Sequence, residues 1–326
     1  MFPTGREQLL ASLRRARAVR VDSITDLVGN TPLVRLHHIE RDCPGVELWA
    51  KCEFCNPAGS VKDRAALRIV RDALARGALG PGMRLLDSTS GNTGIAYAMV
   101  GAALGVPVTL VMPENVSAPR KQVSTAYGVE IVYSSPMEGS DGAIVLAKKL
   151  VREHPDRYFY ADQYSNPNNP LAHYHTTAPE IWAQTEGKIT HFVTGIGTSG
   201  TVVGTSRRLR ELSPNIRCVA IQPDDAMHGL EGMKHLPSSL VPAIYDGAAV
   251  HDTMWMSTDE GWDMAERLGH EEGLFVGHSS GGNVAGALRI GKQLAARGER
   301  GLVVTVLCDR GDRYFVPLRW EKHYLW

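Results

Sequence analysis

Short apolar runs alternate with longer stretches in which apolar residues recur every three or four positions, along most of the chain. Runs of the first kind are typical of buried strands, and stretches of the second kind are typical of helices packed on a sheet. The predicted strands cover residues 33–37, 46–53, 84–87, 108–112, 129–133, 158–161, 191–194, 217–222 and 302–307. The predicted helices cover residues 61–77, 92–104, 140–152, 171–184, 200–212 and 280–297, and two more begin after Ala118 and near Ser257.

Strands that alternate with helices in this way form parallel sheets with helices on both faces. The pattern therefore predicts an α/β fold. Glycine-rich loops near residues 91 and 197 suggest one sheet in each half of the chain, and residues 223–252 are expected to be irregular.

Composition sets the class of protein. A chain of 326 residues, 43% hydrophobic and 21% charged, is long enough for about two domains with ample cores. Basic and acidic residues number 35 each, so no overall field favours nucleic acid or an anionic membrane, and no apolar run is long enough to cross a bilayer. The odd and sparse cysteines indicate reduced thiols in a cytoplasmic protein: Cys43, Cys52, Cys55, Cys218 and Cys308.

Some features resemble special sites but are expected to be structural. Cys52 and Cys55 have C-x-x-C spacing, yet no second pair of ligands lies nearby, so we expect buried, inert thiols and no metal site. Thr4 with Glu7 forms a capping box in an arginine-rich stretch that acids interrupt, so an amphipathic helix is expected there rather than a targeting segment. Several histidines show no metal-ligand spacing and are expected at the surface or at helix ends: His173, His175, His228 and His235.

One lysine lies at the entry of a predicted helix, within residues 56–64. The residues before it have turn chemistry, and Ser60 followed by Asp63 is typical of an N-cap with an acid in the first turn. Lys62 then meets the positive end of the helix dipole, which disfavours its protonated form. An isolated lysine at such a place is usually solvated, but a less protonated one is a nucleophile that can form a Schiff base with a carbonyl cofactor.

Three further loops follow predicted strands or open predicted helices, where ligands bind in open parallel sheets. Residues 88–94 offer several hydroxyls and unblocked backbone N–H groups at a helix start, which can hold a carboxylate or serve as an ordinary helix cap. Residues 277–282 place Ser279 at a helix start, where it can bind a ring nitrogen or cap the helix.

The third loop, residues 195–204, is rich in glycine, so its backbone can approach a phosphate at the N-terminus of the next helix. It also fits the G-x-G-x-x-G pattern of dinucleotide sites, with Asp224 and Asp225 about where a ribose-binding acid would lie. A nucleotide-dependent oxidoreductase is therefore an alternative. Against it, these acids lie beyond Pro223, and two threonines in the loop suit a terminal phosphate better than a pyrophosphate.

Together, a lysine nucleophile, a phosphate cradle, a carboxylate loop and a serine for a ring nitrogen describe pyridoxal phosphate carrying an amino acid. The chain is similar to the cysteine synthase family, the β-replacement branch of the fold-type II pyridoxal phosphate enzymes. The motifs that carry this resemblance occur in family order, at residues 29–36, 56–64, 89–94, 197–201 and 277–281.

The resemblance implies a tryptophan synthase β-like fold. In such a fold, residues 48–156 would form a smaller, mobile substrate-binding domain, and residues 1–47 with 157–326 would form a larger domain that binds the cofactor phosphate. Family members are generally homodimers, so a homodimer is expected, and a serine acetyltransferase is a candidate partner.

The resemblance also assigns roles to residues. It implies that Lys62 binds pyridoxal 5'-phosphate as a Schiff base and moves the substrate's α-proton, that Asn92 contacts the phenolic oxygen of the cofactor, and that Ser279 faces the pyridine nitrogen. The residues implied to hold the phosphate are Gly197, Thr198, Ser199, Gly200 and Thr201. The residues implied to bind the substrate carboxylate are Thr89, Ser90, Thr93 and Gln163.

The implied activity is β-replacement on O-acetylserine or O-phosphoserine, with sulfide or a related sulfur donor, to give L-cysteine. A neutral serine opposite the pyridine nitrogen agrees with prompt loss of a β-leaving group. Cystathionine or diaminopropionate synthesis and serine dehydration remain alternatives within the same cofactor class, and a non-catalytic relative that acts as a binding partner is a weaker one.

Residues 229–237 look more like the cysteine synthase B branch of the family. That branch often has an arginine where Lys234 lies, and in some members this basic side chain engages a phosphorylated serine. Lys234 is therefore either a contact for an anionic leaving group such as phosphate or a solvated lysine. Residues 309–316 follow the family only loosely.

Overall fold

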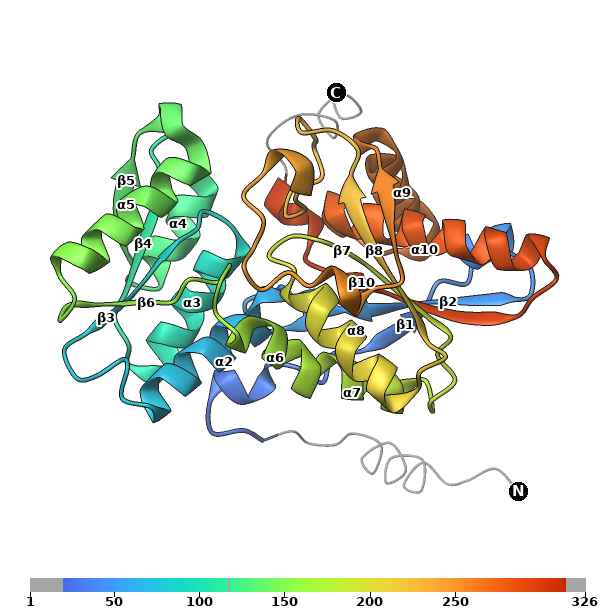
Figure 1. Ribbon diagram of the computed structural model, residues 1–326, viewed down its shortest axis with the longest axis horizontal. Helices are drawn as coiled ribbons and strands as arrows, with labels where there is room; N and C mark the ends of the chain where they lie inside the picture. The colour runs from blue at the N-terminus through green and yellow to red at the C-terminus, as the bar shows by residue number, and fades with distance from the viewer. Residues whose placement is uncertain (1–19, 117, 315–326) are drawn as a thin grey trace, which may run out of the picture.

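The computed structural model describes residues 20–116 and 118–314, so the helix expected near Thr4 and Glu7 lies outside the described residues. The chain forms two mostly parallel sheets with helices, which build two lobes side by side (Figure 1). The predicted α/β fold is confirmed. Within the described ranges, no helix combines the length and the apolar character needed to span a membrane.

The larger sheet has six strands in the order β1-β2-β10-β7-β8-β9. Neighbouring strands run parallel except β1 and β2, which are antiparallel. Its strands are β1 (Leu33–Arg35), β2 (Val46–Cys52), β7 (His191–Gly195), β8 (Arg217–Pro223), β9 (Asp252–Met256) and β10 (Gly301–Leu307).

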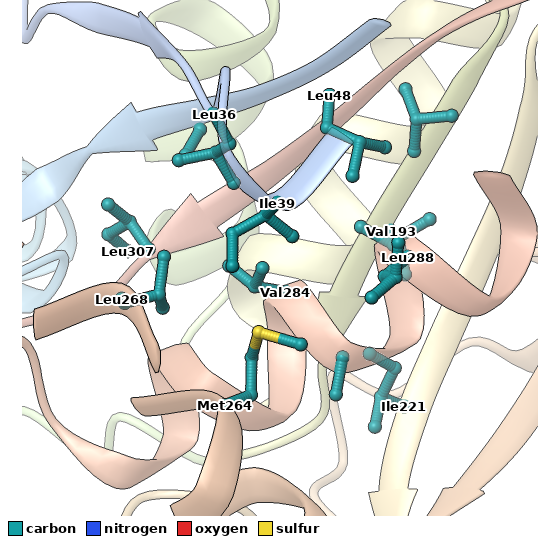
Figure 2. Close-up of a cluster of buried hydrophobic side chains, with 14 of the residues drawn as sticks. Leu36, Ile39, Leu48, Val193, Ile221, Met264, Leu268, Val284, Leu288 and Leu307 are labelled. Carbon is teal, nitrogen blue, oxygen red and sulfur yellow. The ribbon is translucent and has the colours of Figure 1, made fainter. Parts of the chain in front are cut away.

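Helices cover both faces of this sheet because its central strands are apolar on both sides. On β10, Val303 and Leu307 pack toward α9 (Thr258–Glu272) and α10 (His278–Ala296), whereas Val304 and Val306 pack toward α7 (Thr177–Gln184) and α8 (Gly200–Leu212). Figure 2 shows the first of these two cores, where side chains from β2, β7, β8 and β10 meet those of α9 and α10.

The smaller sheet has the order β5-β4-β3-β6 and is parallel throughout. Its strands are β3 (Arg84–Ser88), β4 (Val108–Pro113), β5 (Glu130–Ser134) and β6 (Tyr158–Tyr160). Leu85 and Leu110 pack with α2 (Lys62–Ala75) and α3 (Asn92–Leu104), and Leu86 and Val111 pack with α5 (Gly139–Glu153) on the opposite face. The helix α4 (Ala118–Ala126) precedes β5.

Along the chain, the larger sheet gives way to the smaller one between residues 52 and 84, and the chain returns to the larger sheet between residues 160 and 191. β2, residues 46–52, belongs to the larger sheet, and β6, residues 158–160, belongs to the smaller one. The larger sheet therefore takes strands from both ends of the described chain rather than from one half of it.

The helix predicted over residues 171–184 is two helices, α6 (Asn168–His175) and α7. They are separated at Thr176, whose backbone lies at φ −125° and ψ −65°, outside the helical region. Its hydroxyl donates to the Ala172 carbonyl at 2.7 Å and accepts from Arg64 at 2.9 Å. The break lets α6 pack against α2 while α7 covers the larger sheet.

Short 3₁₀ helices connect these elements: η1 (Ile24–Leu27), η2 (Ile39–Asp42), η3 (Glu53–Cys55), η4 (Pro136–Glu138), η5 (Leu236–Ser238), η6 (Gly247–Ala249) and η7 (Gly311–Tyr314). Two of them matter for function. η3 leads from β2 to α2, and η7 follows β10, so both lie at the carboxyl end of the larger sheet.

Candidate active site

The loops singled out in the sequence converge on one cavity. It lies at the carboxyl ends of β7 and β10, against the first residues of α2, α3, α8 and α10. Sequence-predicted residues that line it are Lys62, Asn92, Gly197, Thr198, Ser199, Thr201 and Ser279. Residues of the loop after β8 close one side: Glu231, Gly232 and Met233.

Lys62 is the first residue of α2. Ser60 does not cap the helix at the expected position, because the helix begins after Val61, but its hydroxyl accepts from the Lys62 N–H at 3.2 Å. The Asp63 carboxylate accepts from the Ala58 N–H at 2.6 Å, and burial raises the pKa of Asp63 to about 7. The turn that presents Lys62 is thus held by its own side chains.

A buried ion cluster fixes the helix that carries Lys62. Arg64 lies 2.7 Å from both Glu53 and Glu180, and Lys51 lies 2.7 Å from Glu180. Burial alone would raise the pKa of Glu53, but Arg64 outweighs it and lowers that pKa to about 2. The cluster joins β2, η3, α2 and α7, so the start of α2 is tied to the larger sheet.

The loop between β7 and α8 has no room for side chains at two glycines. A Cβ on Gly197 would lie 2.2 Å from the carbonyl oxygen of Gly232, and one on Gly200 would lie 1.9 Å from Oδ1 of Asn169. Asn169 in turn donates to the Thr198 hydroxyl at 3.0 Å, a contact with no signal in the sequence. The glycines therefore let the backbone of this loop pack closely at the N-terminus of α8.

Ser199 shows that the loop is built for a ligand. Its φ of +70° is a conformation that favours glycine, and its buried hydroxyl has no hydrogen-bond partner among the described residues. The backbone N–H groups that begin α8 lie at the same place and favour an anion. An unpaired hydroxyl donor beside a helix N-terminus fits a phosphate group.

His173 lies in the last turn of α6, as one of the two expectations had it, but it is buried rather than at the surface. Its Nδ1 lies 2.9 Å from the Thr177 hydroxyl and its Nε2 lies 3.2 Å from the Thr201 hydroxyl. Burial lowers the pKa of His173 to about 3, so the ring is neutral at neutral pH.

The loop between β3 and α3 leaves its hydroxyls largely uncommitted to the helix. α3 begins at Asn92 after Gly91, with no side-chain capping hydrogen bond. Thr93 donates to Oε1 of Gln163 at 2.7 Å, so two of the expected carboxylate contacts meet although 70 residues separate them. The residues expected to bind the substrate carboxylate are not among those that line the cavity: Thr89, Ser90, Thr93 and Gln163.

Ser279 lies inside the first turn of α10 and does not cap it. The N-cap is Gly277, with no side-chain capping hydrogen bond. The next serine, Ser280, accepts from the Cys308 N–H at 2.9 Å, and Asn283 accepts from the Gly195 N–H at 2.7 Å. These two bonds lock α10 to the ends of β10 and β7, so that Ser279 faces the cavity.

Lys234 is not among the residues that line the cavity, although it follows Met233, which does. Its Nζ sits 5.3 Å from the centre of the Tyr164 ring, a cation–π contact. Burial lowers the pKa of Lys234, and the nearby carboxylate of Asp141 opposes that shift. Lys234 is therefore half-buried rather than freely solvated.

The cysteine pair agrees only in part with expectation. Cys52 is buried, but Cys55 is exposed, so the expectation of two buried thiols is wrong for Cys55. Burial raises the pKa of Cys52 to about 12, which leaves it an unreactive thiol.

Across residues 20–116 and 118–314, no group of histidine, cysteine and acidic side chains is arranged to hold a metal ion. Asp224 and Asp225 are exposed and are not among the residues described as lining the cavity.

The lining fits a phosphorylated carbonyl cofactor. The amine of Lys62, the unpaired hydroxyl of Ser199 at the start of α8 and the hydroxyl of Ser279 approach one cavity from three elements. These are the groups needed for a carbonyl, a phosphate and a ring nitrogen, respectively.

Comparisons with known proteins agree with this chemistry. Residues 24–309 match the family described as "Pyridoxal-phosphate dependent enzyme". The chain is 48% identical to cysteine synthase of Aquifex aeolicus, covering 92% of this chain and 91% of that one, and 47% identical to cysteine synthase B of Pseudomonas aeruginosa, covering 91% and 96%. The crystal structure of cysteine synthase from Entamoeba histolytica superposes with a TM-score of 0.88 at 34% identity, covering 92% of this chain and 90% of that one.

A structure of O-ureido-L-serine synthase is similar as well, with a TM-score of 0.85 at 38% identity, covering 93% of this chain and 96% of that one. The match to the family covers most of the chain, and the curated relatives are matched over nearly their whole length. The predicted dependence on pyridoxal 5'-phosphate is confirmed, and the chain belongs to the cysteine synthases of the pyridoxal-phosphate-dependent enzyme family.

Proposed function

We propose that this enzyme forms L-cysteine by replacing the β-substituent of an activated serine, O-acetylserine or O-phosphoserine, with sulfide. The observation that carries the proposal is the convergence of Lys62, the loop 197–201 and Ser279 on one cavity. The curated relatives named cysteine synthase, at 48% and 47% identity, support the same reaction.

The cofactor is held by groups from four elements. Lys62 would bind its carbonyl carbon, Asn92 would contact its phenolic oxygen and Ser279 would face its pyridine nitrogen. The phosphate is held by Gly197, Thr198, Ser199, Gly200 and Thr201. The orphan hydroxyl of Ser199 and the close packing at Gly197 and Gly200 support this assignment.

The bound cofactor supplies an electron sink that permits loss of the α-proton and of the β-substituent. The residues of the chain do the rest. Lys62 accepts the α-proton and later returns it to the same carbon. Ser279 is a neutral partner for the ring nitrogen, which agrees with rapid expulsion of the leaving group.

Binding of the substrate carboxylate is assigned to the loop between β3 and α3. Thr89, Ser90 and Thr93 supply hydroxyl donors at a helix N-terminus, and the bond between Thr93 and Gln163 orients both side chains. Because these residues belong to the smaller lobe or to the connection from it, we propose that the smaller lobe, which carries β3 to β6, closes toward the larger lobe when substrate binds, while β2 stays in the larger sheet.

Lys234 tunes the choice of leaving group. Its cation lies over Tyr164 and near Asp141, and it follows directly on Met233, which lines the cavity. A small movement of this loop brings a positive charge toward the departing group, which favours phosphate over acetate. The enzyme acts in the cytoplasm as a homodimer, and a serine acetyltransferase is its candidate partner.

The visible absorption spectrum tests the function. Purified enzyme reconstituted with pyridoxal phosphate is mixed with O-acetylserine or O-phosphoserine, and then with sulfide, while cysteine is quantified. A spectral change with one of these substrates, reversed by sulfide as cysteine appears, supports the proposal and names the leaving group. The variant Lys62→Ala should form no cysteine while retaining its fold.

Product analysis separates the alternatives. Pyruvate without added sulfide would indicate dehydration or elimination, and diaminopropionate or cystathionine would indicate another nucleophile. The similar O-ureido-L-serine synthase gives a specific reason to look for O-ureido-L-serine among the products. Cysteine formation by the Lys62→Ala variant would overturn the assignment of the catalytic lysine.

A further inference from the structure

The Asn92 side chain is held at both ends by the segment that follows β10. Its Nδ2 donates to Oδ2 of Asp309, and its Oδ1 accepts from the guanidinium group of Arg313. Asn92 starts α3 in the lobe of the smaller sheet, whereas Asp309 and Arg313 follow a strand of the larger sheet. The contact therefore joins the two lobes at the cavity.

We call residues 309–314 the C-terminal strap. Isolated bridges pair it with two loops of the site, Ser60 with Asp309 and Val276 with Arg310. Arg313 also donates to the carbonyl oxygen of Ala58, and a Cβ on Gly59 would lie only 2.7 Å from the guanidinium group. The turn before Lys62 thus leaves a slot for this side chain.

The two charged groups allow only one orientation of the Asn92 amide. A carboxylate only accepts hydrogen bonds and a guanidinium only donates them. If the amide rotated by 180°, its oxygen would face Asp309 and its NH₂ group would face Arg313, and both contacts would be repulsive. The assignment of nitrogen and oxygen in this side chain therefore follows from its neighbours.

The Asp309 carboxylate is itself committed to this arrangement. The Tyr314 hydroxyl donates to the same oxygen, Oδ2. Burial raises the pKa of Asp309, whereas Tyr314, Asn92, Arg313 and Lys62 oppose that rise. Its other oxygen, Oδ1, is buried with no hydrogen-bond partner in the part of the chain that the structure describes.

One N–H of Asn92 remains for a ligand. Nδ2 carries two hydrogens, and Asp309 takes one of them. Asn92 and Asp309 both line the cavity that also holds Lys62. Because its orientation is fixed, the amide can donate this N–H to a negatively charged oxygen of a ligand. An inverted amide would instead place its own oxygen there and repel the ligand oxygen.

We propose that Asp309 and Arg313 are positioning residues that fix the Asn92 amide so that it presents an N–H to the phenolic oxygen of the cofactor. The inference rests on the proposed role of Asn92. Because both residues act through Asn92, replacing either one should weaken cofactor binding only while Asn92 is present.

A double-mutant cycle on cofactor binding tests this coupling. The protein is stripped of cofactor and titrated with pyridoxal phosphate, and both the dissociation constant and the visible absorption band of the bound form are recorded. We expect Asp309→Asn, Arg313→Met and Asn92→Ala each to weaken binding roughly tenfold and to shift the band. In the Asn92→Ala background, adding Asp309→Asn should change binding by less than about twofold, a small part of one hydrogen bond.

The same strap offers a matched control. Arg310 and Asp312 form an exposed pair, with Nε 2.9 Å from Oδ2 and side chains 56% and 41% exposed. Asp312→Asn and Arg310→Met remove the same types of charge from the same segment without touching Asn92. Both variants should bind the cofactor with unchanged affinity and an unchanged band.

The outcomes separate this inference from the function on which it rests. Equal effects of Asp309→Asn with and without Asn92 would overturn the positioning role. An unchanged band and affinity in Asn92→Ala alone would instead overturn the proposed role of Asn92. If thermal unfolding shows that Asp309→Asn does not fold, the cycle of Arg313→Met with Asn92→Ala decides by the same criterion.

Discussion

The Nε2 atom of His173 lies 3.2 Å from the hydroxyl oxygen of Thr201, at the start of α8. A phosphate oxygen only accepts hydrogen bonds, and the Thr201 hydroxyl has a single hydrogen to donate. Thr201 can therefore donate to a phosphate only if its oxygen accepts the other hydrogen bond from Nε2–H of the neutral His173 ring. The Thr177 hydroxyl, 2.9 Å from Nδ1, completes the tautomer by donating there. We therefore expect a chain of hydrogen bonds in which Thr177 donates to His173, His173 donates to Thr201, and Thr201 donates to the phosphate.

This arrangement predicts a pH dependence of stability. The pKa of His173 is about 3 in the folded protein and about 6.5 when unfolded, so the unfolded chain takes up the proton first as the pH falls. Stability is therefore retained above pH 6.5 and lost as the pH falls from there toward 3. From pH 7.5 to 5.5 the loss from His173 is about 1.4 kcal/mol. Urea unfolding at both pH values should show this difference in the native protein and a smaller one in His173→Gln. Equal pH dependence of the two proteins would contradict the prediction.

The conformation and the unpaired hydroxyl of Ser199 predict that this residue lowers the stability of the cofactor-free protein while it serves ligand binding. Its φ of +70° and unpaired buried hydroxyl both cost stability in the absence of a ligand. Ser199→Gly should raise the free energy of unfolding of the cofactor-free protein by roughly 0.5–1 kcal/mol, and Ser199→Val should lower it by roughly 1–3 kcal/mol. Thermal unfolding without cofactor measures both. The idea fails if the valine variant is as stable as the glycine variant.

The buried cluster around Arg64 predicts strong destabilisation when one partner is removed. Arg64→Met leaves Glu53 buried without its cation, which should lower the free energy of unfolding by roughly 3–5 kcal/mol. The double variant Arg64→Met/Glu53→Gln should recover part of this loss because no unpaired charge remains. Denaturant titration of the two variants is the measurement, and equal stability of both would argue against the cluster as described.

The close packing at Gly197 predicts that a side chain there disturbs cofactor binding, and a second glycine, Gly269, provides the control variant. A Cβ on Gly197 would lie 2.2 Å from the backbone of Gly232, which cannot yield cheaply, so Gly197→Ala should weaken pyridoxal phosphate binding at least about tenfold. Gly269 lies within α9 with nothing within 4 Å of such a Cβ. Gly269→Ala should bind the cofactor normally and gain about 0.5–1 kcal/mol of stability. Normal cofactor binding by Gly197→Ala would refute the close packing of the two loops.

Much of the site could be predicted from the sequence because its chemistry is concentrated in contiguous stretches. The lysine turn, the loop 197–201 and the residues around Ser279 each carry a local pattern of glycine and hydroxyl side chains. The alternating pattern placed each of these stretches at the end of a strand or the start of a helix. The convergence of parallel strand ends then brings them together.

The supporting residues could not be predicted in the same way. His173, Asn169 and Asp309 reach the site from segments whose own spacing carries no signal, and only tertiary contacts bring them there. The exposure of Cys55 likewise depends on the path of η3, in which Glu53 is buried and Cys55 is exposed.

Two errors in the element pattern have local causes. β9 is an edge strand with only Met256 buried, so its apolar signal is weak, and the sequence pattern predicts no strand between the irregular span 223–252 and the helix near Ser257. The helix over residues 171–184 is broken at Thr176 because that side chain joins the contacts around Arg64, and helical periodicity continues across the break.

The position of β10 has a consequence for how the protein is made. This strand, the last of those described, lies between β2 and β7 at the middle of the larger sheet, and pairs with β2 from Gly301 to Leu307. The ribosome delivers the strands of the smaller sheet, residues 84–160, long before it delivers β10. During synthesis the smaller lobe can therefore fold while β2 and β7 still have unpaired edges. Unpaired strand edges are prone to pair with the wrong strand. The cofactor pocket of the nascent chain is complete only once β10 is inserted together with Cys308 and Asp309, which follow this strand and line the pocket.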